Sequence, residues 1–538
     1  MPIVTHTKDG GFKAHGVPHS ELVKVENYPQ SLGSGWYSIP TRWAALALFP
    51  YADDGVKDDL FLEHLEVQQS RALELPGVRQ LQHPPEEELY PYQRAGVRYA
   101  QERKHTLFGD MPGLGKTSQA IVSANEKGAE KVLVVCPASV RLQWAEQVKR
   151  WVWPRNAPTP SGLPMINLLL KGSDGVYAGK LPSWTIVSYD LVTRSRAIQE
   201  AILRRGFDLT ILDEVHYLKS FTANRTQVLF GNPEKNTNDN PIVAGSSTIL
   251  GLTGTPLPNR PRECYAITRT FAWHAIDHMG EKGFLSKYNP KMPTGGKATK
   301  YSVARPWELQ ARLRANFMIR RNKRDVLPQL PAVSWEIMRL EPNKEVKAVL
   351  RAEAQTGIDP LDFDTSDFKA QGAIATVRRE MGEAKVPLVV DHVGMMLDGG
   401  VHKVVIFTWH RDVLATLADK LASFGVTTLK GGMTANAAHA AKEKFVQDPN
   451  TRVFIGQIQA CGVGINGLQE VCQTAVFAEA SWTPGDNEQA VDRLARIGQE
   501  GAVTAQFLVA PGGMDDKVLS SSIGKAHDTH NVLDTKVA

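Results

Sequence analysis

Residues 109–117 read Gly-Asp-Met-Pro-Gly-Leu-Gly-Lys-Thr and constrain the fold of this 538-residue chain more than any other segment. A short apolar run at 106–108 precedes them, and a helical stretch that continues through Ser-Gln-Ala-Ile at 118–121 follows them. This order of strand, glycine-rich loop and helix predicts a phosphate-binding loop on a parallel α/β sheet. An ordinary glycine-rich turn before a helix is the alternative.

The residue types in this loop suit the chemistry of a nucleoside triphosphate. Its glycines let backbone N–H groups turn toward phosphate oxygens, and the helix that follows points its positive end at the same anion. Lys116 supplies a point charge for the β- and γ-phosphates, and Thr117 supplies a hydroxyl for Mg²⁺. The general pattern asks for glycine at position 110, which is Asp110 here. The candidate nucleotide-binding residues of the loop are Gly113, Leu114, Gly115, Lys116 and Thr117.

The totals describe an ordinary water-soluble protein of roughly three domains. Apolar residues make up 42% of the chain and charged residues 22%, and no run of eighteen apolar residues is present. The four cysteines are scattered and the N-terminus lacks the layout of a signal peptide, so we expect an intracellular protein, in the cytoplasm or nucleoid if its host is bacterial or a phage. The net charge of +5 permits local patches that bind nucleic acid but does not argue for them.

Short apolar runs alternate with helical stretches in two parts of the chain, which predicts two parallel α/β domains. The early runs lie at 106–108, 132–136, 185–187, 209–212 and 249–252. The late runs lie at 404–407, 453–455, 475–477 and 507–509. The domains that this pattern predicts are a small N-terminal module at 1–85, an α/β domain at 86–262, a helical region at 263–400 and a second α/β domain at 401–538.

Two acidic residues, Asp213 and Glu214, directly follow the apolar run at 209–212. The carboxyl ends of parallel strands face the ligand crevice, so a carboxylate there can hold Mg²⁺ while its neighbour deprotonates water. Alone, such a pair is most often a solvated turn. Together with the upstream phosphate loop, it predicts a site for hydrolysis of the triphosphate.

Residues 489–499 have the pattern of a helix. At 100° per residue, Gln489, Arg493 and Arg496 share one stripe, beside an apolar stripe that should pack inward. A solvated basic face is the commoner fate of such arginines. The alternative is a pair of arginine fingers that meet the γ-phosphate across a domain cleft.

These motifs resemble those of the Swi/Snf family of helicase superfamily two, and the resemblance covers about 89–516. The family's loop usually reads Asp-Glu-Met-Gly-Leu-Gly-Lys-Thr, so Asp110 is normal for it, and the departure lies at Met111 and Pro112. Residues 260–265, which include Arg260, Pro261 and Glu263, further resemble the annealing-helicase subgroup. The matching segments, in chain order, are 89–96, 109–117, 136–139 with 143–144, 188–190, 213–216, 252–256, 317–331, 462–466 and 489–499.

The resemblance implies two RecA-like domains that close on ATP and Mg²⁺. It implies that Gln93 reads adenine, that Asp213 holds the metal and that Glu214 activates water. It implies further nucleotide contacts at Gly464 and Gln489, and catalytic arginines at Arg493 and Arg496. Residues near the DNA backbone would be Ser139, Ser188, Thr255, Trp409 and His410.

The expected activity is that of a DNA-stimulated ATPase that translocates on duplex DNA and remodels it, with forks or branched junctions as candidate substrates. A strand-separating helicase and a remodeller that displaces proteins from DNA are the alternatives, and the sequence names no protein partner. A basic cluster lies on the DNA surface or is structural, and comprises Arg312, Arg314, Arg320, Arg321, Lys323 and Arg324. In the N-terminal module, the segment around Trp36, Tyr37 and Arg42 is either a second DNA contact or part of a small core.

Overall fold

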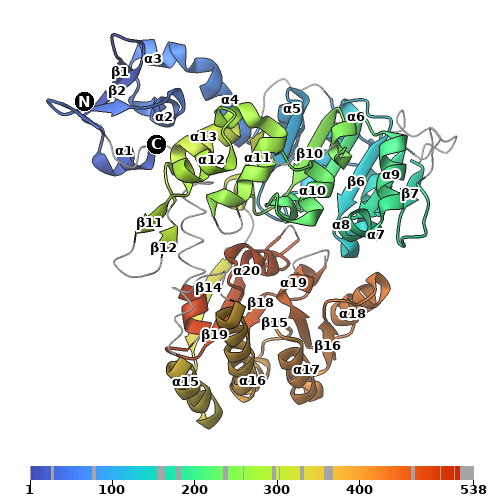
Figure 1. Ribbon diagram of the computed structural model, residues 1–538. Helices are drawn as coiled ribbons and strands as arrows, with labels where there is room; N and C mark the ends of the chain where they lie inside the picture. Colours follow the sequence, from blue (N-terminus) through green and yellow to red (C-terminus); the bar gives the residue numbers. More distant parts are fainter. Residues whose placement is uncertain are drawn as a thin grey trace. The chain divides into compact units, whose positions relative to one another are not determined.

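The computed structural model divides into two compact units, which are described separately (Figure 1). Unit 1 contains the described residues of Met1–Met292 and Tyr301–Val326, and unit 2 those of Pro293–Lys300 and Leu327–His527. The residues that the structure describes are 2–25, 30–74, 80–153, 164–176, 183–233, 240–257, 260–293, 299–301, 303–327, 333–356, 368–461, 467–496, 498–513 and 515–520.

The N-terminal part of unit 1 is a small antiparallel sheet with helices. The sheet has the order β1-β2-β4-β3. Its strands are β1 (Ile3–His6), β2 (Phe12–His15), β3 (Ser31–Gly33) and β4 (Trp36–Ile39). Its helices are α1 (His19–Val25), α2 (Arg42–Ala47), α3 (Asp54–Asp59) and α4 (Phe61–Arg71). Trp307, Ala311 and Ala315 of the later helix α13 (Pro306–Asn316) complete its core, so this module shares its interior with the rest of unit 1.

A seven-stranded parallel sheet forms the centre of unit 1, in the order β13-β5-β10-β9-β6-β8-β7. Every residue of strand β6, Val-Leu-Val-Val-Cys, is buried, as expected for a parallel strand with both faces covered. The strands are β5 (His105–Phe108), β6 (Val132–Cys136), β7 (Ile166–Leu168), β8 (Trp184–Ser188), β9 (Leu209–Asp213), β10 (Thr248–Leu252) and β13 (Met318–Ile319). The helices are α5 (Pro91–Gln101), α6 (Lys116–Glu126), α7 (Arg141–Trp151), α8 (Tyr189–Arg194), α9 (Arg196–Arg205), α10 (Asn224–Phe230), α11 (Tyr265–Ala272), α12 (Glu281–Tyr288) and α13 (Pro306–Asn316).

Unit 2 is built on a six-stranded parallel sheet in the order β14-β19-β18-β15-β17-β16. The strands are β14 (Val333–Arg339), β15 (Val404–Thr408), β16 (Val426–Leu429), β17 (Val453–Gln457), β18 (Thr474–Phe477) and β19 (Val503–Val509). The main helices are α15 (Lys344–Thr356), α16 (Phe368–Asp398), α17 (Arg411–Lys420), α18 (Ala435–Gln447), α19 (Ile458–Cys461) and α20 (Pro484–Val491). The two sheets confirm the predicted α/β class with two parallel-sheet domains.

All nine apolar runs that the sequence predicted as strands lie in strands of these two sheets. The stretch 263–400 contributes to both units: α11 to α13 and β13 lie in unit 1, whereas β14, α15 and α16 lie in unit 2. The prediction of one helix over 489–499 is wrong, because α20 ends at Val491 and the chain continues in turns to Arg496. Among the described residues, no helix has the length and apolar character needed to cross a membrane.

Candidate active site

The predicted phosphate loop connects β5 to α6. Gly113 and Gly115 have φ angles of 84° and 70°, a left-handed conformation that glycine adopts without strain. Gly115 is also the N-cap of α6, and a Cβ at this position would collide with the Gln93 side chain. These two glycines therefore give the loop its shape, as the sequence predicted.

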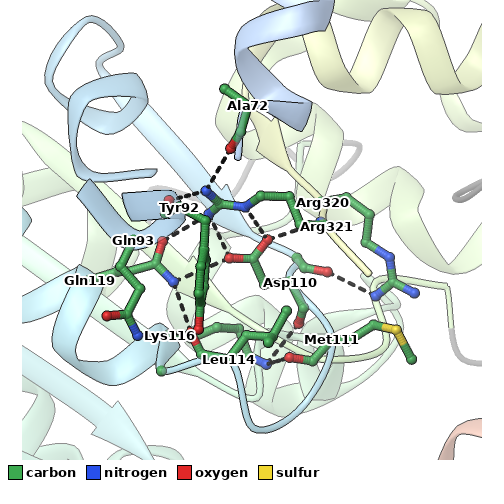
Figure 2. Close-up of polar contacts among 12 residues, drawn as sticks. Ala72, Tyr92, Gln93, Asp110, Met111, Leu114, Lys116, Gln119, Arg320 and Arg321 are labelled. Atoms are coloured by element: carbon green, nitrogen blue, oxygen red, sulfur yellow. Dashed lines mark hydrogen bonds and ion pairs between the residues drawn. The ribbon is translucent and has the colours of Figure 1, made fainter. Parts of the chain in front are cut away.

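Lys116 lies at the start of α6 and folds back over the loop (Figure 2). Its Nζ donates to the backbone oxygens of Asp110, at 2.8 Å, and Met111, at 3.3 Å. Burial lowers the pKa of Lys116 to about 8, although the carboxylates of Glu214 and Asp110 oppose this. Bound phosphate would offer the ammonium group a stronger partner than these carbonyls.

Asp110, which stands where the general pattern has glycine, forms a buried ion pair with Arg321 (Figure 2). Arg321 Nε and Nη2 donate to its two carboxylate oxygens, at 3.0 and 2.7 Å. The backbone N–H of Arg321 donates to the same carboxylate, at 3.0 Å. Burial opposes ionisation, but the Arg321 guanidinium holds the pKa of Asp110 below its ordinary value. The aspartate thus fastens the start of the loop to the segment that follows β13.

Gln119 and Gln93 extend this network along the loop (Figure 2). Gln119 accepts from Arg321 Nη2 at 2.9 Å, and its Nε2 donates to Asp110 Oδ2 at 3.2 Å. Gln93 Nε2 donates to the Leu114 backbone oxygen at 3.2 Å, while its Oε1 accepts from the Tyr90 N–H at 2.9 Å. Gln93, the predicted adenine-reading residue, therefore lies beside the loop and is 5% exposed.

A second arginine joins the phosphate loop to the loop after β10. Arg320 Nη1 donates to the backbone oxygens of Gly109 and Gly254, each at 2.8 Å. Gly254 also lies against Pro112, since a Cβ on Gly254 would stand 2.5 Å from the Pro112 ring. The departure from the family pattern at Pro112 is thus accommodated by close packing between the two loops.

Asp213 and Glu214 end strand β9, which β10 separates from β5 in the sheet. Glu214 has φ 50° and ψ 50°, a left-handed conformation unusual for a residue with a Cβ and common at functional sites. Burial, together with the charge of Glu214, raises the pKa of Asp213 to about 6. His216 Nδ1 lies 3.2 Å from Glu214 Oε2 and 2.9 Å from Thr253 Oγ1, so it connects this pair to the loop after β10.

The donor set here fits Mg²⁺. Asp213 offers a carboxylate and Thr117 a hydroxyl, both of them hard oxygen ligands. Proteins commonly bind Mg²⁺ with one or two carboxylates while substrate phosphates complete the shell. Within the described residues, no group of three or more His, Cys, Asp and Glu side chains is placed to hold a metal ion.

Three predicted nucleotide-site residues are described in unit 2, and Gly464 lies outside the described residues. Gln489 is 8% exposed in α20. Arg493 and Arg496 follow in the turn, where Leu494 is fully buried in the core of the unit. Burial and the neighbouring Arg493 charge lower the pKa of Arg496 to about 10. The Asp492 carboxylate opposes this shift.

The predicted DNA-contact residues differ in exposure. Ser139 is exposed in the short 3₁₀ helix before α7. Ser188 is 1% exposed, and its hydroxyl caps α8 by accepting from Leu191 N–H at 3.3 Å. Thr255 is 9% exposed. A DNA phosphate near Ser188 would therefore meet neighbouring atoms rather than this hydroxyl.

In unit 2, the Trp409-His410 corner is held by Glu479. The Glu479 carboxylate accepts from the backbone N–H of Trp409, at 2.8 Å, and of His410, at 2.9 Å. His410 Nδ1 lies 2.6 Å from the other carboxylate oxygen. The guanidinium carbon of Arg378 stands 5.2 Å from the centre of the Trp409 ring. The corner is thus a rigid, partly exposed feature.

Four arginines of the predicted basic cluster are buried, which decides for the structural alternative at those positions. Arg312 is 1% exposed and pairs with Glu308 at 2.9 Å and Asp277 at 2.8 Å. Arg314 donates to the Arg320 backbone oxygen at 2.7 Å. The buried members are Arg312, Arg314, Arg320 and Arg321. Sequence reasoning could not separate them from surface arginines, because most of the groups that they contact, such as Asp110 for Arg321 and the Gly109 backbone oxygen for Arg320, are distant in the chain.

Two family models match the chain. The SNF2-related domain matches residues 92–377, which is more than half of the chain, and the helicase conserved C-terminal domain matches residues 385–498. The motifs that predicted the family therefore lie inside the matched regions or at their borders.

Curated relatives agree with these matches. A "SWI/SNF-related matrix-associated actin-dependent regulator of chromatin subfamily A-like protein 1" from Xenopus tropicalis is 30% identical over 436 residues, which cover 80% of this chain and 43% of that protein. The human "DNA annealing helicase and endonuclease ZRANB3" is 28% identical over 459 residues, covering 83% of this chain and 40% of that protein. This chain thus spans less than half the length of these relatives.

Among solved structures, the Sulfolobus solfataricus SWI2/SNF2 ATPase core in complex with dsDNA is similar to this chain, with 18% identity and a TM-score of 0.39. The match covers 86% of this chain and all of that one. The family assignment rests on the SNF2-related domain match together with the loop and carboxylate geometry. This chain belongs to the SNF2-related family of helicase-like, ATP-hydrolysing enzymes.

Proposed function

We propose that this chain is an ATP-dependent translocase on double-stranded DNA that remodels DNA, with forks or branched junctions among its substrates. One observation carries the proposal. The phosphate loop, the Asp213–Glu214 pair and the loop after β10 follow the neighbouring strands β5, β9 and β10, in a chain of the SNF2-related family. The carboxyl edge of a parallel sheet is where such folds bind nucleotides.

Hydrolysis would use the residues at this edge. Loop N–H groups and Lys116 would hold the β- and γ-phosphates, and Thr117 with Asp213 would hold Mg²⁺, which would neutralise charge developing on the phosphate oxygens. Glu214 would accept a proton from the water that attacks the γ-phosphorus, as the bond to the ADP oxygen breaks. Its left-handed backbone gives its carboxylate a position that a regular strand would not.

The second unit would complete the site. Arg493 and Arg496 would reach the γ-phosphate, and Gln489 and Gly464 would contribute nucleotide contacts. Burial lowers the pKa of Arg496 to about 10, and a phosphate bound nearby would favour its charged form. Cycles of closure and reopening, driven by ATP binding and product release, would then move one unit past the other along DNA.

Duplex DNA is the proposed track. Ser139, Thr255, the region of Ser188 and the Trp409-His410 corner would contact its phosphates. Contacts to phosphates position a protein without reading sequence, which a moving enzyme requires. One observation supports DNA as the partner: relatives that this chain resembles carry the name DNA annealing helicase.

We also propose a second DNA contact on the N-terminal sheet. Lys13, His15 and Trp36 lie on its outer face, with Lys13 Nζ 4.4 Å from the Trp36 ring centre and the His15 ring 5.0 Å away. A cation beside a partly exposed aromatic ring suits a stacked base or a phosphate. Arg42 does not belong to this surface, because Asp59 and Glu63 bind its guanidinium.

The test is the ATPase rate on single-stranded, duplex, forked and four-way DNA. Duplex DNA should stimulate the ATPase, and branched DNA should stimulate it further. The double substitution of Lys13 and Trp36 to alanine should selectively reduce the additional activity on branched DNA. If single-stranded DNA stimulates the ATPase as strongly as duplex DNA does, the strand-separating alternative is favoured. A requirement for DNA-bound protein would favour the remodeller that displaces proteins. Deletion of residues 1–84 is a poor test, because α13 completes the core of this module.

A further inference from the structure

Asp213 receives hydrogen bonds from two buried aromatic side chains. The indole N–H of Trp144 donates to Asp213 Oδ2 at 2.7 Å. The hydroxyl of Tyr189 donates to the backbone oxygen of Asp213, also at 2.7 Å. Trp144 is 2% exposed and Tyr189 is 3% exposed, so bulk water competes little for either hydrogen bond.

Trp144 and Tyr189 lie in the segments that follow strands β6 and β8, respectively. In the sheet, β6 lies between β8 and β9, with Val135 opposite Leu212 and Cys136 opposite Ser188. Trp144 lies in the first half of α7, five residues after the exposed Ser139. Tyr189 is the first residue of α8.

These bonds fix how the Asp213 carboxylate is turned. Its Oδ2 is held by Trp144, and its Oδ1 accepts from the Glu214 N–H at 3.1 Å. An indole N–H can only donate, so the bond favours the ionised carboxylate. Tyr189 also packs edge-on against Tyr217, which in turn packs against His216 near Glu214. Tyr189 thus contacts Asp213 directly and is joined to Glu214 only through Tyr217 and His216.

Packing alone does not account for this arrangement. A buried tryptophan needs only apolar surroundings and one acceptor for its N–H, and a backbone carbonyl would serve. Here the acceptor is the carboxylate that would hold Mg²⁺. Groups that hydrogen-bond a metal ligand set its orientation, and their loss typically weakens metal affinity or activity about 10- to 100-fold.

We propose that Trp144 and Tyr189 are positioning residues through which DNA, bound at the loops after β6 and β8, sets the orientation of Asp213 and so the affinity for Mg²⁺ with nucleotide. This inference deepens the proposed function and rests on it. Ser139 and Trp144 are joined by one 3₁₀ turn and the start of one helix, so displacement of the loop by a DNA phosphate reaches the indole through rigid backbone. Since coupling is reciprocal, Mg²⁺ with nucleotide tightens DNA binding by the same factor.

The test is the Mg²⁺ titration of fluorescent ADP binding, with and without saturating duplex DNA, in the full chain. The parent protein should reach half-saturation at a lower Mg²⁺ concentration when DNA is present. Trp144→Phe should raise the half-saturating Mg²⁺ concentration about 10-fold without DNA and should lose the shift caused by DNA. Fluorescent ADP binding without Mg²⁺ should be unchanged.

Two further variants make the result specific. Tyr189→Phe removes only a hydroxyl and should reduce the DNA-dependent shift, which keeps the proposal testable if Trp144→Phe does not fold. Trp151→Phe, at the far end of α7 where the ring packs against His83, is the matched control and should behave like the parent.

Parent-like Mg²⁺ titrations and DNA shifts in both Trp144→Phe and Tyr189→Phe would overturn the inference. If duplex DNA stimulates the parent ATPase without shifting its Mg²⁺ titration, the coupling is refuted while the proposed function stands. If duplex DNA neither stimulates the parent ATPase nor shifts its Mg²⁺ titration, the proposed function itself fails. The titration without DNA then still shows whether Trp144 orients Asp213.

Discussion

The guanidinium of Arg321 holds the carboxylate of Asp110 at two points, with Nε 3.0 Å from Oδ1 and Nη2 2.7 Å from Oδ2. Both side chains are at most 1% exposed. The pair explains why an acidic residue occupies a position where many phosphate loops have glycine. It ties the first residues of the loop to the segment that leads, six residues later, to Leu327, where the chain passes from unit 1 into unit 2.

Breaking this pair should destabilise unit 1. Asp110→Ala would leave the Arg321 charge buried without its partner, which typically costs about 3–5 kcal/mol of unfolding free energy. Arg321→Lys should also destabilise, because an ammonium group cannot reproduce the two-point contact. Urea unfolding followed by fluorescence measures both. Arg196→Ala, in an exposed pair with Glu200, is the control and should change little; an equally small loss in Asp110→Ala would contradict the buried-pair assignment.

Lys116→Ala and Glu214→Gln should fail at different steps. Lys116→Ala should lose ATP binding and hydrolysis together, because it removes the charge that neutralises the phosphates. Glu214→Gln should retain ATP binding and lose turnover, since Asp213 remains to hold the metal. Filter binding of labelled ATP beside a phosphate-release assay separates the two. Hydrolysis by Glu214→Gln at the parent rate would show that another group activates the water.

Nucleotide binding should depend on pH through Lys116. Its pKa in the free protein is about 8, and bound phosphates favour the charged form and so raise that pKa. Above pH 8 most Lys116 side chains are neutral, so ATP binding should take up a proton and weaken as the pH rises; below pH 7 neither effect should appear. Calorimetry in buffers of different ionisation enthalpy measures the uptake. In Lys116→Arg the guanidinium stays charged, and persistent uptake there would assign the proton to another group.

Local features of the candidate site followed from the sequence because each lies within a short contiguous segment. The conformations of Gly113 and Gly115, and the position of Asp213 at a strand end, are set by local patterns that the structure confirms. The partner of Asp110 was not predictable in this way. Arg321 is 211 residues from Asp110, and only the pairing of β13 with β5 brings them together.

A two-residue strand, an edge strand and one helix end show the same limit. β13 has two residues and β14 has the mixed exposure of an edge strand, so neither produces a strong apolar run. The pattern of 489–499 is helical throughout, yet α20 ends at Val491, where Leu494 N–H bonds to the Val491 carbonyl in a tighter turn. Periodicity reports which face is buried, and Leu494 is indeed buried, but it does not report where the helix ends.

Arg493 and Arg496 should matter for turnover rather than for ATP affinity. The variants Arg493→Ala and Arg496→Ala should each bind ATP nearly as the parent does. Each should hydrolyse ATP on the order of 10³-fold more slowly, because an arginine finger no longer stabilises the charge of the transition state. Single-turnover hydrolysis beside equilibrium binding measures both quantities. Arg452→Ala, whose side chain binds backbone oxygens elsewhere in unit 2, is a matched control. Parent rates in Arg493→Ala and Arg496→Ala would place both arginines outside the catalytic site.

Movement along duplex DNA, driven by ATP hydrolysis, should displace a third strand that is bound to the duplex. A triplex-forming strand is released when a translocase runs into it, without separation of the duplex strands. The parent should release the third strand only with ATP and leave the duplex intact, and Glu214→Gln should show no release above background. Release that proceeds equally well in Glu214→Gln, or that occurs only together with separation of the duplex strands, would contradict movement along the duplex driven by ATP hydrolysis.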